Sequence, residues 1–182
     1  MESDAARLIQ AFFLSVEDGQ RLLAQEPALI AARDGLGETA LHYLSVENQI
    51  EGVQVLVANG AEINTLNDVG GTPLSEAASL GYVDLVKYLL SAGAQLHIEG
   101  QHAPTLHEAV RSGNHEMVKA ILEAGADVNE IASLDETALH VAAEEDGNVE
   151  IVQLLVAAGA NLCAKRIFDE TPLAVARRVG IW

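Results

Sequence analysis

The chain has 182 residues, of which 49% are hydrophobic but only 4% aromatic, and its formal net charge is −17. Charge of this sign repels phosphate backbones and anionic membrane surfaces, so we expect neither nucleic acid nor a membrane among its partners. Cys163 is the only cysteine, which excludes an internal disulfide and favours a reducing compartment.

The N-terminal stretch does not resemble a signal peptide. It reads MESDAARLIQAFFL, which starts acidic and lacks a basic leading region. No uncharged apolar run in the sequence is long enough to span a bilayer. We therefore expect a soluble, intracellular protein of the cytoplasm, and a monomer.

Residues 1–33 predict two helices. The apolar side chains of the first helix share one face, namely Leu8, Ile9, Phe12 and Phe13. Ser15, with Asp18 three residues later, resembles a capping box that opens a second helix, and Pro27 ends that helix.

Residues 70–96 contain the clearest unit, which predicts a helix, a tight turn, a second helix and a glycine stop. Thr72 followed by Pro73 suits the start of a helix, and Gly81 breaks it. Apolar residues at helical spacing mark the second helix, namely Val83, Leu85, Val86, Leu89 and Leu90. Gly93 closes it, because a residue without a Cβ adopts the left-handed conformation at least cost.

Both the opening and the closing signal of this unit recur in step. The closing Gly-Ala pair begins at Gly60, Gly93, Gly125 and Gly159, at intervals of 33, 32 and 34 residues. The opening tetrapeptide reads TALH, TPLS, PTLH, TALH and TPLA, beginning at Thr39, Thr72, Pro104, Thr137 and Thr171. Two independent signals with one period indicate a repeat protein, whose units stack to bury their apolar faces.

These motifs closely resemble the ankyrin repeat, a unit of about 33 residues with the signature T-P-L-H-x-A. The resemblance covers about residues 34–182 and implies an all-α solenoid of stacked helix-turn-helix units with short β-hairpin fingers. We expect a single ankyrin-repeat domain over residues 1–182. Its parts are a degenerate N-terminal cap at 1–33, four repeats at 34–66, 67–98, 99–131 and 132–165, and a half repeat or C-terminal cap at 166–182.

Three repeats depart from the pattern. In the first, Leu44 replaces the small residue Ala77 of the second, so its packing must differ locally, and Asn48 replaces Gly81 in the left-handed turn. The third has Pro104 at the cap position, so we expect a shortened or distorted finger. The fourth has one additional residue in its turn at 144–147.

The fifth unit stops after one helix. Two interpretations stay open at this point. Either Val179, Ile181 and Trp182 cover the last apolar face, or the sequence is cut short.

We find no catalytic, cofactor-binding or metal-binding motif. The sequence lacks a G-x-S-x-G elbow, a P-loop and a dinucleotide fingerprint, so we expect no enzyme activity, cofactor or metal. His42, His107 and His140 share one repeat position, and the resemblance implies that they tie adjacent loops together by hydrogen bonds.

Two weaker alternatives concern the remaining reactive side chains. His97, His102 and His107 are spaced by five residues and allow a metal site or a pH switch, although a hydrated loop is the simpler interpretation. Cys163 allows a reactive thiol, although an incidental thiol is the simpler interpretation.

The resemblance also implies where a partner binds, namely at the finger tips and at the exposed edge of the first helix in each repeat. Each repeat has one tip position, and four of the five tip residues are apolar. The tip residues are Leu36, Val69, Gln101, Leu134 and Phe168. Exposed apolar rows usually mark interaction sites, and Phe168 is the strongest candidate anchor. The alternative is that each side chain folds onto the neighbouring finger and completes local packing.

Charged residues surround these tips. The helix-edge candidates are Glu47, Leu80, Arg111, Glu144 and Glu145, and the candidates beside the tips are Glu38, Glu136 and Glu170. This mixture suits a partner protein with a basic rim around apolar anchors. The alternative is a charged surface that only binds water.

We therefore expect a non-enzymatic protein–protein interaction module, an adaptor or a scaffold. The alternative is an acidic inhibitor, such as an immunity-type protein that neutralises a basic nuclease or toxin. An inhibitor that acts by charge loses most of its affinity at high salt, whereas an adaptor with apolar anchors does not.

Overall fold

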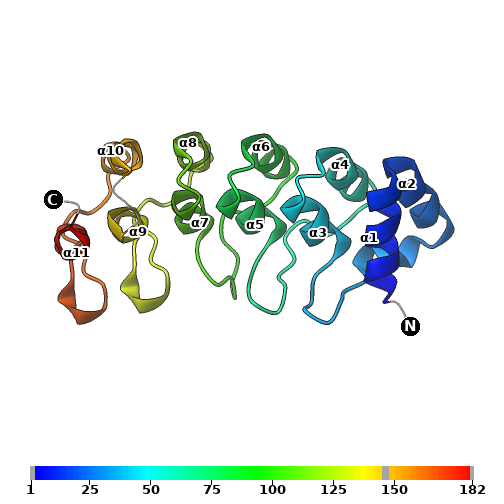
Figure 1. Cartoon of the computed structure of the whole chain (residues 1–182), viewed down its shortest axis with the longest axis horizontal. Helices are drawn as coiled ribbons and strands as arrows, with labels where there is room; N and C mark the ends of the chain where they lie inside the picture. The colour runs from blue at the N-terminus through cyan, green and yellow to red at the C-terminus, as the bar shows by residue number, and fades with distance from the viewer. Residues whose placement is uncertain (1–2, 145–147, 181–182) are drawn as a thin grey trace. The chain divides into compact units, whose positions relative to one another are not determined.

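The computed structural model describes residues 3–144 and 148–180. They belong to two compact units, Met1–Ala77 with Asp84–Gln101, and Ala78–Val83 with His102–Trp182. In each unit by itself, helices lie in two rows, with the loops that join them projecting on one side (Figure 1). None of the helices in these described ranges has both the length and the apolar character needed to cross a membrane.

The first unit begins with three elements that precede the regular pairs. They are α1 (Asp4–Leu14), α2 (Val16–Gln25) and the 3-10 helix η1 (Pro27–Ala31). Two helix pairs follow, α3 (Ala40–Val46) with α4 (Ile50–Ala58), and α5 (Pro73–Ser79) with α6 (Val83–Ser91), of which Ala78, Ser79 and Val83 are assigned to the second unit. α1 packs against both α2 and α3, so the N-terminal helices cover one face of the first regular pair.

The second unit contains two helix pairs and a further helix. The pairs are α7 (Thr105–Arg111) with α8 (His115–Glu123), and α9 (Ala138–Glu144) with α10 (Val149–Ala157), followed by α11 (Pro172–Val179). The 3-10 helices η2 (Ser133–Asp135) and η3 (Ile167–Asp169) form the tips of two loops. α7 packs against α9, α9 against α11, and α8 against α10, so successive repeats stack on one another as in an all-α solenoid.

Most of the N-terminal prediction is confirmed. Ser15 Oγ accepts a hydrogen bond from the Asp18 N–H at 3.0 Å, and α2 ends at Gln25, just before Pro27. The apolar face of α1 is wrong at one position, because Phe13 is 51% exposed. The buried residues Ala5, Leu8, Ile9 and Phe12 follow the spacing i, i+3, i+4 and i+7, which turns position 13 away from the core.

The local change in packing predicted for Leu44 is an exchange of large and small residues. Leu44 is fully buried, and a Cβ built on Gly52 would lie 2.8 Å from its Cδ1 atom. The second repeat has the opposite arrangement, with Ala77 and Leu85 in the corresponding positions, both fully buried. The large side chain has therefore moved from one helix of the pair to the other.

The repeat signals act as predicted. Gly60, Gly93, Gly125 and Gly159 are left-handed at the helix ends, and Asn48 takes the left-handed turn with φ of 53°. The Thr39 N–H donates to His42 Nδ1 at 3.2 Å, so the proton of this imidazole is on Nε2, which donates to the Gly71 carbonyl at 3.3 Å. His140 repeats this arrangement with Thr137 and Glu170, which confirms that these imidazoles join adjacent loops.

The fingers have the shape of hairpins but contain no β-strand among the described residues. Asp34 donates its N–H to the Glu38 carbonyl, and Asn67, Ala132 and Arg166 repeat this bond with the residue four positions later. One isolated bridge joins Ile131 to Thr137. The third finger differs, as expected, because it is closed by a tighter turn in which the Gln101 N–H donates to the Ile98 carbonyl.

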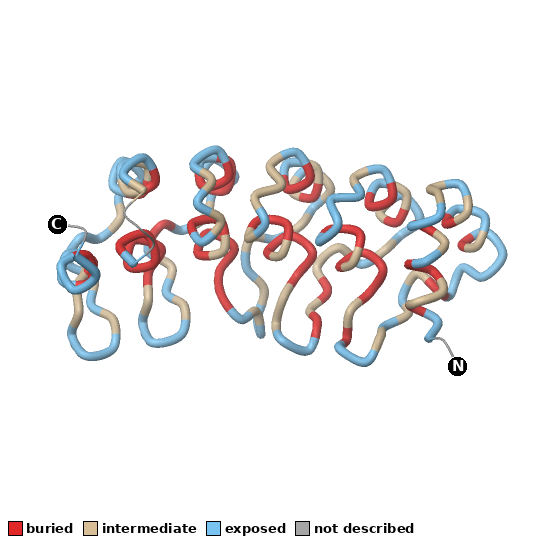
Figure 2. Tube along the Cα trace, viewed as in Figure 1, coloured by how far each residue is buried: buried red, intermediate tan, exposed pale blue. Residues whose placement is uncertain are grey.

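Two predictions reach residues beyond this description. The additional residue of the fourth repeat lies at 144–147, and residues 145–147 are outside the described ranges. Ile181 and Trp182 also lie outside them, while Val179 is exposed. Figure 2 shows that burial within each unit is greatest in the first helix of each pair, and that the finger tips are exposed.

Candidate functional site

In the first unit, two apolar finger tips are exposed and adjacent. Leu36 is 60% exposed and Val69 is 72% exposed, while Gln101 is half-buried. The Asp68 N–H donates to the Leu36 carbonyl at 2.9 Å, so the backbones of the first two tips are in direct contact. The glycine that follows each tip adopts the left-handed conformation, which leaves Leu36 and Val69 in ordinary backbone geometry.

In the second unit, the exposed tips are held in an unfavourable backbone conformation. Leu134 is 63% exposed with φ of 65°, and Phe168 is 86% exposed with φ of 67°. Asp135 and Asp169, which follow them, are also left-handed. This conformation costs about 1–2 kcal/mol for a residue with a Cβ. The exposure of Leu134 and Phe168 argues against the alternative that these side chains complete local packing.

A cluster of carboxylates lies beside the tips of the first unit. Tyr43 Oη donates to Asp34 Oδ2 at 2.8 Å. Asn67 Nδ2 donates to Glu76 Oε1 at 2.8 Å and to Glu38 Oε1 at 3.4 Å, so one amide lies between two carboxylates. Three acidic side chains are therefore close together, joined by neutral donors.

The electrostatics of this cluster disfavour full ionisation. Burial, followed by the charge of Glu38, raises the pKa of Glu76 to about 7, against the opposing hydrogen bond from Asn67. Burial and the charge of Asp34 also raise the pKa of Glu38. The hydrogen bond to Asp34 raises the pKa of Tyr43 to about 12. A cation from outside the chain would relieve the repulsion between these carboxylates.

The second unit supplies its own cation at the corresponding place. Arg166, whose side chain is 11% exposed, bonds to Glu136 at 2.8 Å, Glu144 at 2.7 Å and Glu170 at 3.1 Å. Arg178 adds bonds to Glu144 at 2.9 Å and Glu170 at 3.3 Å. The hydrogen bond from Arg166 is the largest cause of a lowered pKa at Glu144.

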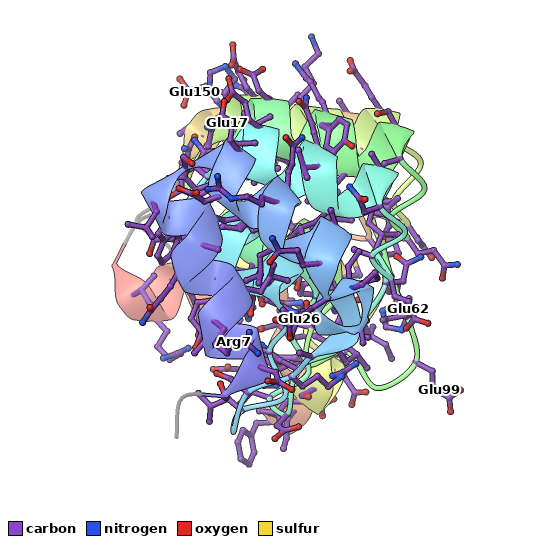
Figure 3. All side chains as sticks on the ribbon, turned by 90° about the vertical axis from the view of Figure 1, so that its right-hand side faces the viewer. Arg7, Glu17, Glu26, Glu62, Glu99 and Glu150 are labelled. Carbon is purple, nitrogen blue, oxygen red and sulfur yellow. The ribbon has the colours of Figure 1, made fainter. Side chains whose placement is uncertain are left out.

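This network has the geometry of a strong interaction. Arg166 uses three nitrogens, Nε, Nη1 and Nη2, to reach carboxylates from two fingers and from α9. By contrast, Arg7 lies at the surface of the first unit, where it bonds to Glu26 at 2.7 and 3.2 Å and to Asp4 at 3.5 Å, and the side chains of Arg7 and Glu26 are 38% and 45% exposed (Figure 3). Exposed pairs of that kind are screened by water and contribute little, whereas largely buried arginines that bond to several carboxylates contribute more.

The remaining predicted site residues differ in their exposure and in whether they are paired within the chain. Glu47 and Leu80 are exposed, and Arg111 bonds to Glu108 at 2.8 Å and to Glu136 at 3.2 Å. Glu145 lies outside the described residues. Four of the predicted residues are thus already paired within the chain, namely Arg111, Glu136, Glu144 and Glu170. The carboxylates of these three glutamates are therefore less available to a partner than the sequence suggested.

The histidine and cysteine alternatives gain no support from the geometry. His107 Nε2 donates to the Glu136 carbonyl at 3.0 Å, in the same way as the other two repeat histidines. Within residues 3–144 and 148–180, no group of three or more His, Cys, Asp or Glu side chains is placed to hold a metal ion. Cys163 is an exposed free thiol.

Sequence reasoning missed several members of both clusters. Five residues before the residue that opens each repeat, the chain carries Asp34, Asn67, Glu99, Ala132 and Arg166, so a basic residue stands at this position only in the last repeat. That departure, four residues before Glu170, was the signal that could have drawn attention to Arg166. Tyr43 and Glu76 share another position, four residues after the opening Thr of their repeats.

Comparison with known proteins agrees with this architecture. A family model described as "Ankyrin repeats (3 copies)" matches residues 11–100 and 101–166. Ankyrin repeats generally mediate protein–protein interaction, and the family is typically non-catalytic.

Individual relatives share only part of their length with this chain. Human "Ankyrin repeat and SOCS box protein 16" is 36% identical over 128 residues, which is 69% of this chain and 28% of that protein. The Caenorhabditis elegans "Transient receptor potential cation channel subfamily A member 1 homolog" is 28% identical over 127 residues, 70% of this chain and 10% of that protein. Variola virus "Ankyrin repeat protein OPG189" is 30% identical over 120 residues, 64% of this chain and 21% of that protein. The chain spans less than a third of each of these relatives, but the family match extends over most of its own length, and it belongs to the ankyrin-repeat family.

Proposed function

We propose that this chain is a non-enzymatic adaptor or scaffold module that binds another protein through its finger tips and the adjoining helix edges. The observation that carries the proposal is the exposure of large apolar side chains at equivalent tip positions, where solvated loops normally carry polar residues. In the second unit, the cost of holding Leu134 and Phe168 left-handed adds to it, because strained residues persist mainly where they serve a function.

The chemistry of the surface suggests how a partner is recognised. Phe168 and Leu134 offer apolar contact area in the second unit, and Leu36 and Val69 offer it in the first. In the first unit, Glu38 and Glu76 share one neutral amide, so a lysine or arginine of the partner would gain from approaching them. We therefore assign the partner a basic rim around apolar anchors.

The other candidate residues belong to the edge of the same surfaces. They are Glu47, Leu80, Gln101, Arg111, Glu136, Glu144 and Glu170. The three glutamates among them, Glu136, Glu144 and Glu170, contribute little net negative charge. Arg111, Arg166 and Arg178 bond to them and neutralise them. This pairing disfavours the alternative of an acidic inhibitor that mimics nucleic acid.

The surroundings in which the module acts follow from charge and cysteine content. A formal charge of −17 opposes self-association, so we propose a monomer. The exposed thiol of Cys163 suits a reducing, cytoplasmic environment.

Affinity capture from a native lysate at two salt concentrations tests the proposal. We expect Phe168→Ala and Leu134→Ala to lose captured proteins, with only a modest effect of salt on the unmodified chain. Leu14→Ala is the matched control, because Leu14 is 80% exposed but lies on α1, away from any finger. Retention of every captured protein by both tip variants would show that the tips are not the binding surface, and loss of nearly all capture at high salt would favour the inhibitor.

A further inference from the structure

The first repeat ends its second helix with a residue that the other repeats lack. Asn59 follows α4 and precedes the glycine stop Gly60. The three equivalent places carry alanine before the glycine, namely Ala92, Ala124 and Ala158. Asn59 and Gly60 also form the only Asn-Gly pair in the sequence. Such a pair is chemically reactive, because glycine has no side chain to hinder attack of its own nitrogen on the asparagine amide.

In the folded chain, hydrogen bonds hold both of the groups that react. Asn59 Nδ2 donates to the Val55 carbonyl at 2.8 Å, which keeps the side chain folded back along α4. The Gly60 N–H donates to the Val57 carbonyl at 3.0 Å. The Gly60 nitrogen must lose this proton, and the Asn59 side chain must leave Val55, before the nitrogen can attack. The reaction therefore requires the last turn of α4 to open.

This turn opens more readily than the rest of the first unit. Ala58, Asn59 and Gly60 are all exposed, and the first fully buried side chain before them is Leu56. Opening the turn breaks a few backbone hydrogen bonds and uncovers little apolar surface, so it costs less free energy than global unfolding. We propose that Asn59 is a site of spontaneous deamidation, and that opening of the last turn of α4 controls its rate.

The reaction needs only water as a co-reactant. The Gly60 nitrogen loses its proton to the solvent and bonds to Asn59 Cγ, while the Cγ–Nδ2 bond breaks and ammonia leaves with a proton from the solvent. The product is a five-membered succinimide ring, which water then opens. Attack of water at Cγ gives aspartate, whereas attack at the backbone carbonyl carbon gives isoaspartate, in which the main chain runs through the side-chain carbons. Neither step oxidises or reduces the chain.

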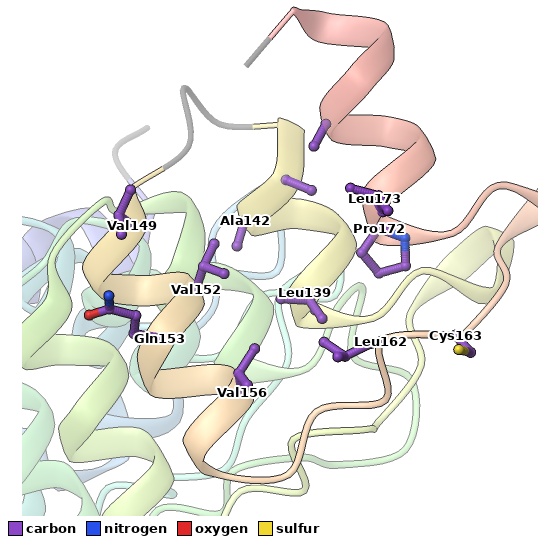
Figure 4. A pocket seen from close by; sticks show the side chains of 12 residues that line it. Leu139, Ala142, Val149, Val152, Gln153, Val156, Leu162, Cys163, Pro172 and Leu173 are labelled. Carbon is purple, nitrogen blue, oxygen red and sulfur yellow. The ribbon is translucent and has the colours of Figure 1, made fainter. Parts of the chain in front are cut away.

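The glycine stop sets the direction in which the chain leaves the helix. At the equivalent stop after α10, Figure 4 shows the chain turning from Val156 into the loop that carries Leu162 and Cys163. After α4, the corresponding loop carries Asn64, whose Nδ2 donates to the Gly93 carbonyl at 3.3 Å. The stop after α4 therefore positions a loop that bonds to the following repeat.

Isoaspartate at position 59 weakens this stop for two reasons. The Gly60 N–H donates to the Val57 carbonyl, and the Ala61 N–H donates to the Leu56 carbonyl at 3.0 Å. An additional backbone carbon before Gly60 shifts both donors away from these acceptors. The new carboxylate also lies at the C-terminal end of α4, where the helix dipole disfavours negative charge. An opening that is reversible before the reaction thus becomes permanent after it.

Incubation of the full chain at mildly alkaline pH, with and without enough urea to unfold it, tests the proposal. Peptide mapping by mass spectrometry measures the conversion of the Asn59 amide to an acid. We expect this conversion to be about tenfold slower or more in the folded chain than in urea, because the turn is closed most of the time. Equal rates in the two conditions would overturn control by the turn, and absence of conversion in urea would overturn the reactive site itself.

Two matched glycine variants distinguish opening of the turn from global unfolding. Ala58→Gly loosens the last turn of α4 and should accelerate the conversion in the folded chain about threefold, with no change in urea. Ala24→Gly, at an exposed position of α2 in the same unit, should leave the rate unchanged. Equal acceleration by both variants, or acceleration by neither, would contradict control by the α4 turn.

A comparison of stabilities tests the effect on the stop. Ion-exchange chromatography separates the isoaspartyl chain from the unmodified one, because the reaction adds a negative charge. The isoaspartyl chain should unfold at a lower urea concentration than Asn59→Asp, which adds the same charge without lengthening the backbone. The same urea midpoint for both chains would overturn the claim that isoaspartate weakens the stop.

Discussion

Arg166 Nη1 lies 2.8 Å from Glu136 Oε1 and joins two successive fingers of the second unit, whose tips are Phe168 and Leu134. The same guanidinium reaches Glu144 at the end of α9, so one side chain fixes two fingers and a helix. A partner that contacts both tips gains from this connection, because less conformational freedom is lost on binding.

Arg166→Ala should reduce the free energy of unfolding by about 2 kcal/mol, since it leaves Glu136, Glu144 and Glu170 with only the more exposed Arg111 and Arg178 as partners. Urea unfolding measures the change. Arg7→Ala is the matched control and should cost much less than Arg166→Ala, because the bonds from Arg7 to Glu26 and Asp4 are exposed to solvent. Equal losses in the two variants would show that the network adds nothing to an ordinary surface pair.

The pH dependence of the first unit should include a contribution from Glu76. Its pKa in the folded chain is about 7, above the ordinary value of 4.5, so its contribution to stability is complete below pH 4.5 and is lost as the pH rises through 7. Glu76→Gln keeps an acceptor for Asn67 but removes the charge. We therefore expect this variant to be more stable than the unmodified chain by about 2 kcal/mol at pH 8 and equal to it at pH 4.

Unfolding by urea at several pH values measures this difference. Glu62→Gln, at an exposed position, is the control and should change stability at neither pH. His42 acts in the opposite sense, because burial lowers its pKa to about 4 and the chain loses stability as the pH falls from 6.5 towards 4. That contribution is common to the variant and the unmodified chain. A Glu76→Gln difference that does not grow with pH would contradict the assignment.

Pro104 leaves a neighbouring imidazole without a donor. His107 Nε2 bonds to the Glu136 carbonyl, and His107 Nδ1 is buried without a hydrogen-bond partner. At the same position, Thr39 and Thr137 donate their N–H groups to His42 and His140, which proline cannot do. Pro104→Thr should therefore raise the free energy of unfolding by about 1 kcal/mol, the gain from the bond exceeding the lost rigidity of proline.

A double-mutant cycle isolates this effect. In the second repeat, Ser75 Oγ accepts from the Thr72 N–H, so a serine at position 107 would still accept the new bond, and His107→Ala, which has no acceptor, is the background to use. The gain from Pro104→Thr is attributable to the bond with the imidazole only if it disappears in the His107→Ala background. An identical gain in both backgrounds would place its origin in the loop instead.

Leu44 and Gly52 should behave as a compensating pair. Leu44→Ala should cost about 2–4 kcal/mol by leaving a cavity, and Gly52→Leu should cost about 1–3 kcal/mol because its Cβ would meet Leu44. The double variant restores the arrangement of Ala77 and Leu85 and should cost less than the sum of the two. Strictly additive losses, measured by urea unfolding, would show that the exchange of volumes does not occur.

These examples show what the sequence could and could not predict. The period of the Gly-Ala pairs and of the Thr-opened tetrapeptides predicts the helix pairs, because caps and glycine stops act locally. The partners of Arg166 were not predicted, because they come from α9 and from two fingers that are about thirty residues apart. The exposure of Phe13 and the Leu44–Gly52 exchange depend on three-dimensional packing, which a one-dimensional pattern of apolar residues does not contain.

Phe168, at the tip of the last finger, should lower the stability of the chain and favour the binding of a partner protein. Phe168 has φ of 67° and is 86% exposed, so its side chain gains little from the fold, while its backbone costs about 1–2 kcal/mol. Asn adopts the left-handed conformation more readily than other residues with a Cβ. We therefore expect Phe168→Asn to raise the free energy of unfolding by about 1 kcal/mol and to reduce capture of partner proteins.

Phe168→Leu separates the two effects. It keeps an apolar side chain and the unfavourable backbone, so it should retain most of the capture without gaining stability. Thermal unfolding and affinity capture of the three chains at one salt concentration make the comparison. If Phe168→Asn is more stable and captures as much protein as the unmodified chain, the aromatic tip has no role in binding. If Phe168→Asn is less stable, Phe168 makes a packing contribution within the fold, and its conformation need not be explained by a partner.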